Sequence, residues 1–268
     1  MVMASATVTV QVSDLTEYAM KQHLLGMALL AVSASAWSLS CTPKPAFEVL
    51  HTGKVYVDSV FWLQSSEPES QAHISVADLQ LQLDGKAVAA LQANPKKIAG
   101  YTGFQVQPQL QAGGAYQVVL KDKKRDSYAF LSDLANRFTV ETKIVTSPDL
   151  AWRESPKLIK VKHHSGTWGD SGNVLWSLKT TRPLQDYLVV IQLAPERNME
   201  KAQTFIVNPV SLQGQEVVGV GFGLCQYGPE TYVFSKNSTV WAKFDLLSHD
   251  GKRIPWQSKP QKTRLRPH

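Results

Sequence analysis

An alternation of apolar and polar residues with a period of two runs from Phe47 through most of this chain, and it constrains the fold more than any other feature. Leu79, Leu81 and Leu83, for example, are separated by glutamines. Successive side chains of a β-strand point to opposite faces, so this period predicts strands with one buried face. Helical periodicity is almost absent. The sequence therefore predicts an all-β protein with two groups of about six or seven short strands, arranged as two tandem β-sandwiches.

Turn residues separate these strands and indicate how the chain is divided. Asp84-Gly85 is a strong signal for a two-residue hairpin turn, which would place Val88 opposite Leu81. Residues 146–149 include a proline and few charges, so we expect the join between the sandwiches there. The expected organisation is a first sandwich over residues 37–146, a second over 147–251 and a basic tail over 252–268.

One motif in the first half is typical of Greek-key sandwiches. Leu110, Gly113 and Tyr116 have the Leu-x-x-Gly-x-x-Tyr spacing of a tyrosine corner, in which the tyrosine hydroxyl bonds to the backbone upstream. In this motif the chain resembles the immunoglobulin-like and fibronectin type III superfamilies. The resemblance covers seven residues and implies two immunoglobulin-like β-sandwich domains. It implies no function, because a sandwich fold serves many functions.

The N-terminal region contains a pattern for export. Lys21 precedes an uncharged apolar run over Leu24–Val32, and Ala34-Ser35-Ala36 follows with the small residues that signal peptidase recognises. We interpret residues 20–36 as a cleaved signal peptide, with residues 1–19 as an upstream extension and either Met1 or Met20 as the start. A buried N-terminal helix is the alternative. The expected location is the periplasm or the extracellular space.

Composition excludes several classes of protein. With 43% hydrophobic and 19% charged residues among 268, the chain is too apolar to be disordered. Its two cysteines, Cys41 and Cys225, are too few for a disulfide scaffold or a four-cysteine zinc site. In an oxidising compartment we expect them to form a disulfide bond with each other. Lipidation of Cys41 stays open, although Ser38 stands where a lipobox requires an aliphatic residue.

The positive charge is concentrated at the C-terminus. The formal net charge is +6, and residues 252–268 contain six cations and no carboxylate. We expect a solvated tail, as chain termini often are. Alternatively, four cations of this tail could bind a polyanion: Lys259, Lys262, Arg264 and Arg266.

Alternating glycines in the second half mark the first candidate binding site. Gly219, Gly221 and Gly223 alternate with bulky residues, so they would form the bare face of a strand. Glycine in a strand indicates the close approach of a backbone, a ring or a ligand. We expect an aromatic side chain or the other sandwich to pack there, with the floor of a binding groove as the alternative.

Two tryptophans are further candidates for binding. Trp62 and Trp241 each share a strand phase with polar residues, and either could be a half-exposed platform on which a sugar or peptide stacks. Packing between two layers is the more common role of a tryptophan.

Two other motifs suggest chemistry but have simpler interpretations. Residues 169–172 spell the Gly-Asp-Ser-Gly of chymotrypsin-like proteases, without the rest of that family's motifs, so we interpret them as a hairpin turn. His163-His164 would point to opposite faces of a strand and could not easily bind one metal ion. We expect His163 to be packed and His164 to be solvated.

These patterns favour an exported protein that binds or scaffolds a component of the cell envelope, without catalysis. We expect no cofactor and no metal. The partner would be an envelope protein or a glycan, with the tail contacting an anionic surface; nucleic acid is not favoured. The ligand and the oligomeric state stay open.

Two alternatives are retained. The first is a pilus-type periplasmic chaperone that lends a strand to its partner, because residues 137–144 have suitable alternation before the join. The second is a hydrolase or lyase of envelope polysaccharide, which requires two carboxylates facing one cleft. The sequence does not show which of its carboxylates would pair; the candidates are Asp58, Asp78, Asp170 and Glu216.

Overall fold

The computed structural model describes residues 47–65, 74–107, 109–125, 136–142, 149–166, 169–223, 231–257 and 259–266, which belong to one compact unit. The predicted signal peptide, its upstream extension and the expected join at residues 146–147 lie outside these residues. Within them, no helix is long and apolar enough to cross a membrane. Because the described residues form one compact unit and the expected join lies outside them, the division into two domains stays a prediction. The all-β fold is confirmed.

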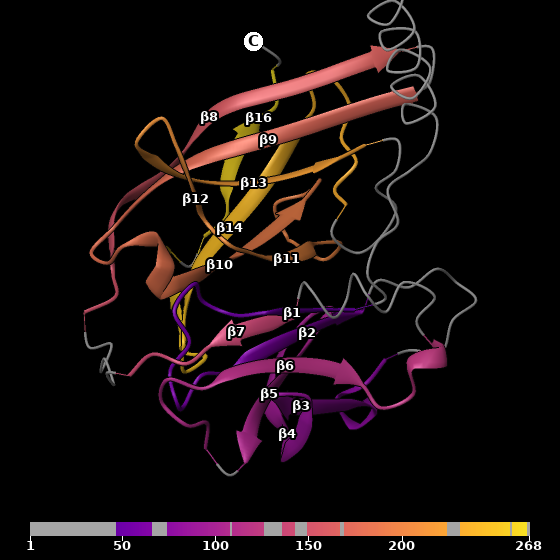
Figure 1. Cartoon of the computed structure of the whole chain (residues 1–268). Coiled ribbons are helices and arrows are strands. Elements are labelled where there is room, and N and C mark those ends of the chain that lie inside the picture. The colour runs from indigo at the N-terminus through magenta and orange to yellow at the C-terminus, as the bar shows by residue number, and fades with distance from the viewer. Residues whose placement is uncertain are drawn as a thin grey trace, which may run out of the picture. The chain divides into compact units, whose positions relative to one another are not determined.

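The first half is a seven-stranded antiparallel sheet in the order β1-β2-β5-β4-β3-β6-β7 (Figure 1). The long strand β4 pairs with β3 through its first residues and with β5 through the rest. It therefore links the β1-β2-β5 part of the sheet to the β3-β6-β7 part. The strands are β1 (Phe47–Leu50), β2 (Phe61–Ser65), β3 (Leu79–Leu83), β4 (Lys86–Ile98), β5 (Tyr101–Gln107), β6 (Ala115–Leu120) and β7 (Arg137–Thr139). Two 3-10 turns accompany them, η1 (Val76–Asp78) and η2 (Lys123–Arg125).

A buried asparagine joins the two ends of this sheet. The side-chain oxygen of Asn136 accepts the Val49 N–H at 2.8 Å, and its side-chain nitrogen donates to the Phe47 carbonyl at 3.5 Å. Asn136 lies immediately before β7, and its carbonyl also accepts from Val118 of β6. The edges β1 and β7 are thereby closed around one apolar core, and these backbone groups of β1 are satisfied.

The core of the first half consists of the apolar phase that the sequence predicted. Leu79 and Leu81 of β3 are buried, and the rings of Phe61 and Phe104 stack with centroids 5.4 Å apart. The remaining buried members come from β1, β2, β5, β6, β7 and the segments between strands, and the partly buried Leu91 of β4 packs against them. Burial alternates along β3 and along β5 from Phe104 to Gln107, which confirms that the period of two sets the inward face there.

The Asp-Gly turn is confirmed, but the expected register beyond it is wrong. Asp84 and Gly85 have φ values of 50° and 75°, as a type I′ turn requires. A β-bulge then shifts the register, so that Leu81 pairs with Ala89. The extra residue is Val88, which is 42% exposed and does not lie opposite Leu81. A bulge adds one residue to one strand, which alternation alone does not reveal.

The tyrosine corner is present in the structure. The Tyr116 hydroxyl accepts a hydrogen bond from the Gln111 backbone N–H at 3.0 Å. Gly113 has a φ of 79°, and a Cβ on Gly114 would lie 2.6 Å from the Tyr116 ring. Both glycines are therefore required by the chain path, which agrees with the resemblance to immunoglobulin-like sandwiches.

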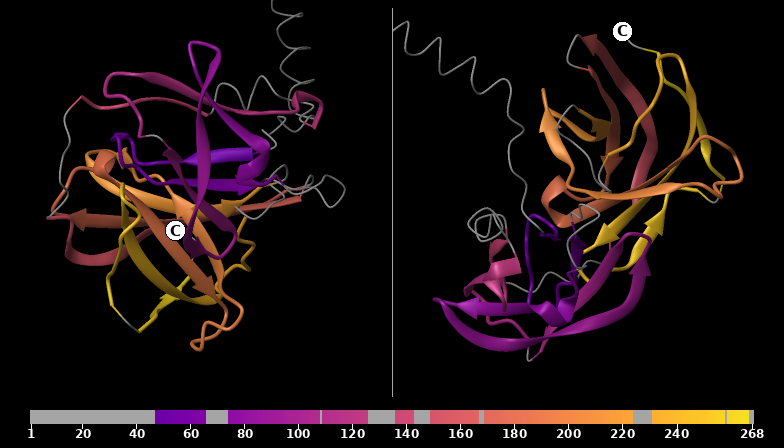
Figure 2. Two further views of the ribbon diagram at one scale, coloured as in Figure 1. Left: turned by 90° about the horizontal axis from the view of Figure 1, so that it is seen from below. Right: turned by 90° about the vertical axis from the view of Figure 1, so that its right-hand side faces the viewer.

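The second half contains two sheets packed face to face (Figures 1 and 2). One sheet has the order β12-β13-β9-β8; the other has β11-β10-β14-β15, with β16 also pairing with β14. The strands are β8 (Trp152–Gly166), β9 (Gly169–Thr180), β10 (Tyr187–Ala194), β11 (Gln203–Val207), β12 (Val210–Leu212), β13 (Gln215–Phe222), β14 (Thr239–Ser248), β15 (Arg253–Pro255) and β16 (Gln261–Arg264), with the 3-10 turn η3 (Leu184–Asp186) before β10. The second core lies between the two sheets.

The basic C-terminal segment is part of the second sandwich rather than a solvated tail. β16 pairs with β14, and Leu265 immediately after it is fully buried in the second core. Lys262 and Arg264 point outward while Thr263 and Leu265 point inward. The residues of β16 pair with residues of β14 that lie 19 to 25 positions earlier in the chain, so the composition of the segment did not indicate the pairing.

A third apolar cluster joins the two halves. Leu188 and Val190 of β10 pack with Trp62 of β2 and Tyr101 of β5. Its remaining members are Leu50, Val60, Ile98, Ile206 and Leu247. β10 therefore buries both faces, one in the second core and one in this junction. That double burial explains its nearly continuous apolar sequence.

Hydrogen bonds and ion pairs supplement the apolar junction. Tyr101 Oη accepts from the Ile206 backbone N–H at 3.0 Å, and the Val60 N–H donates to the His249 carbonyl at 2.7 Å. The buried carboxylate of Asp186 contacts Arg182 at 2.7 Å and Lys54 at 3.8 Å. Desolvation by burial, with Asp186 nearby, raises the pKa of the Tyr56 phenol at the same junction.

Candidate functional site

The glycine-bearing face of β13 points outward, away from the second core. Val218, Val220 and Phe222 of β13 enter that core, so Gly219 and Gly221 lie on the outer face. A Cβ on Gly219 would lie 2.5 Å from Leu175 Cδ2, and one on Gly221 would overlap the Gly172 carbonyl oxygen. What approaches these glycines is a leucine and the backbone of β9. Gly223 is half-buried beyond the end of β13.

Trp62 cannot be an exposed stacking platform, because its side chain is 1% exposed. It lies in the junction cluster, where β2 contacts the second half. This is the packing between layers that the sequence analysis gave as the more common role of a tryptophan. Tyr56 and Asp58, which precede β2, both contact His249 of the second half.

Trp241, in contrast, is half-buried on the outer face of β14. Val240, Ala242 and Phe244 point into the second core, so Trp241 and Lys243 point away from it. The guanidinium carbon of Arg197 lies 5.7 Å from the centroid of the indole ring. Trp241 is therefore held in place by a cation stacked on its ring.

Two of the C-terminal cations lie beside this tryptophan. β14 and β16 run antiparallel with Trp241 opposite Lys262 and Thr239 opposite Arg264. The Cβ atoms of such opposite pairs are about 5 Å apart. We call the surface formed by Trp241, Lys243, Lys262, Arg264 and Arg197 the Trp241 face. Lys259 and Arg266, the other two predicted cations, are exposed on either side of β16.

Sequence reasoning identified only part of the Trp241 face. Lys243 could have been found, since it lies two residues after Trp241 and shares its strand phase. Arg197 lies in the loop after β10 and has no local signal that connects it to Trp241. Lys262 and Arg264 were singled out as part of a tail, and only the pairing of β16 places them beside the indole.

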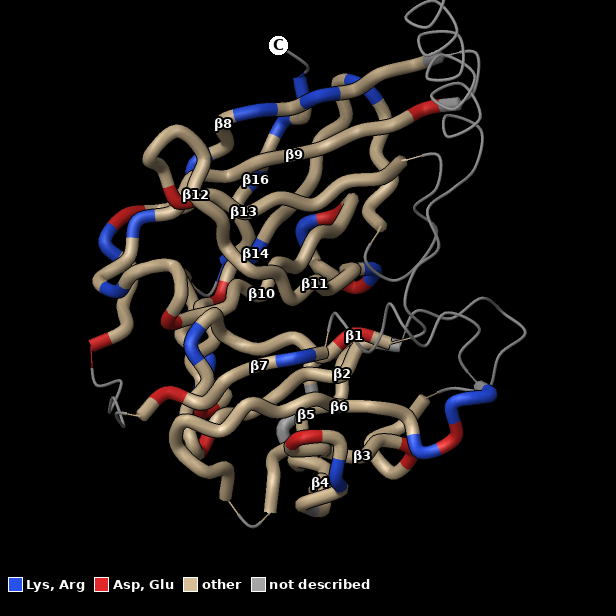
Figure 3. The backbone as a smooth tube through the Cα atoms, in the orientation of Figure 1, with Lys and Arg blue, Asp and Glu red and all other residues tan. Residues whose placement is uncertain are grey.

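The cations of the second half differ in their partners. Lys157 and Lys179 both contact Glu154, at 2.7 and 2.6 Å, and they lower the pKa of this carboxyl to about 2. Arg253 forms an ion pair with Asp245. Lysines and arginines appear as blue stretches along β8 and near β16 in Figure 3. Among the described residues, no carboxylate lies within ion-pair distance of Lys243, Lys262 or Arg264.

The Gly-Asp-Ser-Gly segment is a strand rather than a turn. Residues 169–172 begin β9 and pair with the end of β8, so both strands are longer than the sequence suggested. A Cβ on Gly172 would lie 2.7 Å from the ring of Phe234. His163, opposite Gly172, packs edge-on against Phe222 and Phe234, whereas His164 is exposed. This glycine therefore serves aromatic packing.

The four candidate carboxylates are distributed over the structure with separate roles. Asp78 accepts hydrogen bonds from the Ser75 backbone N–H and hydroxyl at 2.8 and 2.7 Å, which caps η1. Asp58 contacts His249 at 3.4 Å, and Glu216 accepts from the Tyr187 hydroxyl at 3.0 Å. Burial of Tyr187, with Glu216 beside it, raises the pKa of that phenol.

Asp170 and Glu216 cannot form a glycosidase pair. Glu216 of β13 is opposite Leu178 of β9, and Asp170 lies eight residues away along β9. That separation is about 27 Å along a strand, compared with about 5–10 Å between the two carboxyl groups of glycoside hydrolases. Among the described residues, no group of three or more potential ligands is placed to bind a metal ion.

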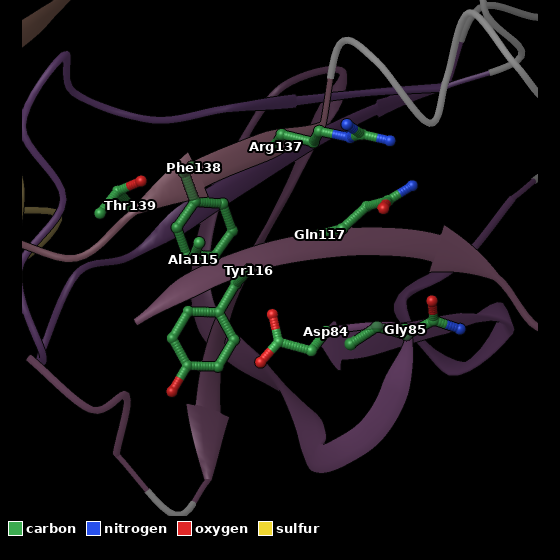
Figure 4. Close-up of a pocket in the computed structure, with 9 residues that line it drawn as sticks. Asp84, Gly85, Ala115, Tyr116, Gln117, Arg137, Phe138 and Thr139 are labelled. Atoms are coloured by element: carbon green, nitrogen blue, oxygen red, sulfur yellow. The ribbon is translucent and has the colours of Figure 1, made fainter. Parts of the chain in front are cut away.

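A pocket of about 430 Å³ opens on the first half, where β3, β6 and β7 lie beside the Asp-Gly turn (Figure 4). Gln82, Gln117 and Arg137 are directly opposite one another across the three strands, and Figure 4 shows Gln117 and Arg137 lying side by side. Their amide and guanidinium groups could bind a carbonyl or carboxylate. Among the described residues that line this pocket, Asp84 has the one carboxylate, so the pocket lacks the second carboxylate that a glycosidase would need.

The predicted cysteine pair cannot be placed, because Cys41 and Cys225 lie outside the described residues.

Comparisons with known proteins add little to this description. No family model and no curated protein sequence matches the chain. Similar solved structures include the FN1-FN3 domains of chicken CNTN1 (10% identity, TM-score 0.26, covering 84% of this chain and 66% of that one). They also include the N-terminal part of the bacterial S-layer protein SbsC (12%, 0.25, 92% and 49%) and pullulanase type I from Bacillus subtilis (9%, 0.22, 81% and 25%). The chain thus spans a quarter to two thirds of these structures.

Proposed function

We propose that this chain is an exported, non-catalytic binding or scaffolding protein of the cell envelope, located in the periplasm or secreted. The observation that supports the proposal is the packed junction between the two halves of the described chain. Neighbouring domains of one chain usually move relative to each other unless their interface is large and apolar. Here nine buried apolar residues form the interface. A junction of this kind holds the surfaces of both sandwiches in one orientation, as a scaffold requires.

Export is the second part of the proposal and depends on residues 20–36. An apolar run as short as Leu24–Val32 suits a cleaved signal peptide better than a permanent anchor. Outside the cytoplasm, a disulfide between Cys41 and Cys225 would also be stable.

The strand-lending chaperone is not favoured by a specific observation. In the segment proposed for lending, Arg137–Thr139 already pairs with β6 as β7, and Val140 bridges to Val55. Phe138 and Val140 of this segment already pack in the core of the first half, so their side chains are not available to fill a partner's sheet.

The proposal is tested by the fate of the N-terminus. The full chain with a C-terminal tag is expressed in a Gram-negative host, fractionated and sequenced from its N-terminus. We expect a periplasmic product that begins at Trp37, because cleavage follows Ala36. Placing an arginine in the apolar run with Leu29→Arg should hold the product in the cytoplasm, whereas Val8→Arg in the upstream extension should not. An uncleaved cytoplasmic product of the unaltered chain would refute the proposal.

A further inference from the structure

We propose that the Trp241 face binds an anionic polysaccharide, with the part of the indole that Arg197 leaves exposed contacting a sugar ring and the surrounding cations pairing with the carboxylate or sulfate groups of the polymer. The inference deepens the proposed function, on which it rests for access to such a polymer. It concerns the outer face of the sheet β11-β10-β14-β16, and only the half of that face that the junction leaves open.

The boundary of the open half follows from the strand registers. On the outer face of β10, Leu188 and Val190 are buried in the junction, while Gln192 is partly exposed. Opposite Gln192 lie Lys243 of β14 and Thr204 of β11. Beyond Val190 this face of β10 therefore leaves the junction: Gln192 is partly exposed, and Ala194, which is opposite Trp241, is buried.

The open half combines a flat apolar ring with cations at short range. Lys262 is directly opposite Trp241, at about 5 Å between Cβ atoms. Lys243 is two residues further along β14, about 7 Å away, and Arg264 is two residues beyond Lys262 along β16, on the other side of Trp241. A tryptophan ring presents an apolar surface that can cover the C–H face of a sugar. Its neighbours could then contact acidic substituents on either side of that sugar.

These cations are available for a ligand. Elsewhere on the second half, Lys157, Lys179 and Arg253 contact carboxylates of the chain itself. Along the outward positions of β14 and β16, the nearest carboxylate is Asp245, which is paired with Arg253. Lys243, Lys262 and Arg264 outnumber the described carboxylates near Trp241, which are Asp245 and the Glu196 beside Arg197, so the face favours an anionic ligand.

A polysaccharide fits the face better than a nucleic acid. Grooves that bind single-stranded nucleic acid use successive aromatic side chains, one for each of several bases. The Trp241 face has one aromatic ring. Beside it, Thr204, Gln192 and Lys243 lie opposite one another on the three neighbouring strands β11, β10 and β14. The hydroxyl and amide groups of that row are suited to hydrogen bonding with sugar hydroxyls.

Binding of defined probes to the full chain tests the inference. Isothermal titration at low salt would use oligogalacturonate and heparin oligosaccharides as anionic glycans, maltohexaose as a neutral one and single-stranded DNA as a competing polyanion. We expect at least one anionic glycan to bind, with affinity falling as salt is raised. Maltohexaose should bind at least about tenfold more weakly, because it lacks the charges. Failure of both anionic glycans to bind would overturn the inference, as would DNA binding that is tighter and lost in Trp241→Ala.

Variants assign the binding to this face. Trp241→Ala should weaken binding about tenfold, and Lys243→Gln with Lys262→Gln by a similar factor. Trp241→Phe, which retains a ring, should keep most of the affinity. Lys86→Gln, an exposed lysine of the first half, should bind like the unaltered protein. Unchanged melting temperatures would show that the variants are folded; equal binding by Trp241→Ala or by the double variant would overturn the inference.

The outcomes separate this inference from the proposed function. Export with cleavage but no glycan binding would refute the binding site alone. Glycan binding by a protein that stays in the cytoplasm would refute the proposed function and leave the Trp241 face as a site.

Discussion

At the scale of single residues, the glycines show most clearly what their positions require. The sequence indicated that something approaches Gly219 and Gly221 closely but not what it was. In the structure, Gly219 meets the end of a leucine side chain, whereas Gly221 meets the backbone of the neighbouring strand. A flexible side chain can rotate away from an added methyl group, and a paired backbone cannot.

This difference gives a matched prediction. Gly221→Ala should lower the free energy of unfolding by about 1–3 kcal/mol, because the new Cβ overlaps the Gly172 carbonyl oxygen. Gly219→Ala, on the same face of the same strand, should cost clearly less, because Leu175 can move. Urea unfolding of the two variants measures both values. Equal losses would show that the approach of β9 does not determine the cost.

At the scale of elements, the basic C-terminal segment is a paired strand and not the solvated tail that its charge suggested. Composition suggested a solvated tail, but β16 pairs with β14 and Leu265 enters the second core. The same pairing places Lys262 and Arg264 next to Trp241. A segment that was notable for its charge is therefore held in place by one apolar residue and by backbone hydrogen bonds.

The anchoring of β16 can be measured. Leu265→Ala should destabilise the protein by about 2–5 kcal/mol, as expected for a fully buried leucine. Arg266→Ala, at the next and exposed position, should change stability by no more than about 0.5 kcal/mol. Thermal or urea unfolding is the measurement. A negligible effect of Leu265→Ala would show that the C-terminal segment is not anchored in the second core.

At the scale of the whole molecule, the junction determines how the two halves behave together. Apolar residues of both halves form one buried cluster, and Tyr101 and Val60 add hydrogen bonds across it. Separating the halves would expose these side chains to water. The free energy of that exposure couples the unfolding of one half to the other.

We therefore expect one cooperative unfolding transition, with calorimetric and van't Hoff enthalpies in agreement. Leu188→Asp should split it into two transitions, because it buries an unpaired charge in the junction. Gln192→Asp, on the same face of β10 but on its open half, should leave a single transition. Two transitions in the unaltered protein, or one in Leu188→Asp, would contradict the coupling.

What the sequence determined by itself was local: strands and their inward faces from the period of two, the type I′ turn from Asp84-Gly85, and the tyrosine corner from Tyr116. These features depend on residues close together in the chain. Tertiary structure decided the bulge after Leu81, the burial of Trp62 and the position of Lys262 beside Trp241. Each depends on which strands pair and in which register. The joint burial of apolar faces from distant segments sets that choice, and the backbone hydrogen bonds between those segments leave no local pattern in the sequence.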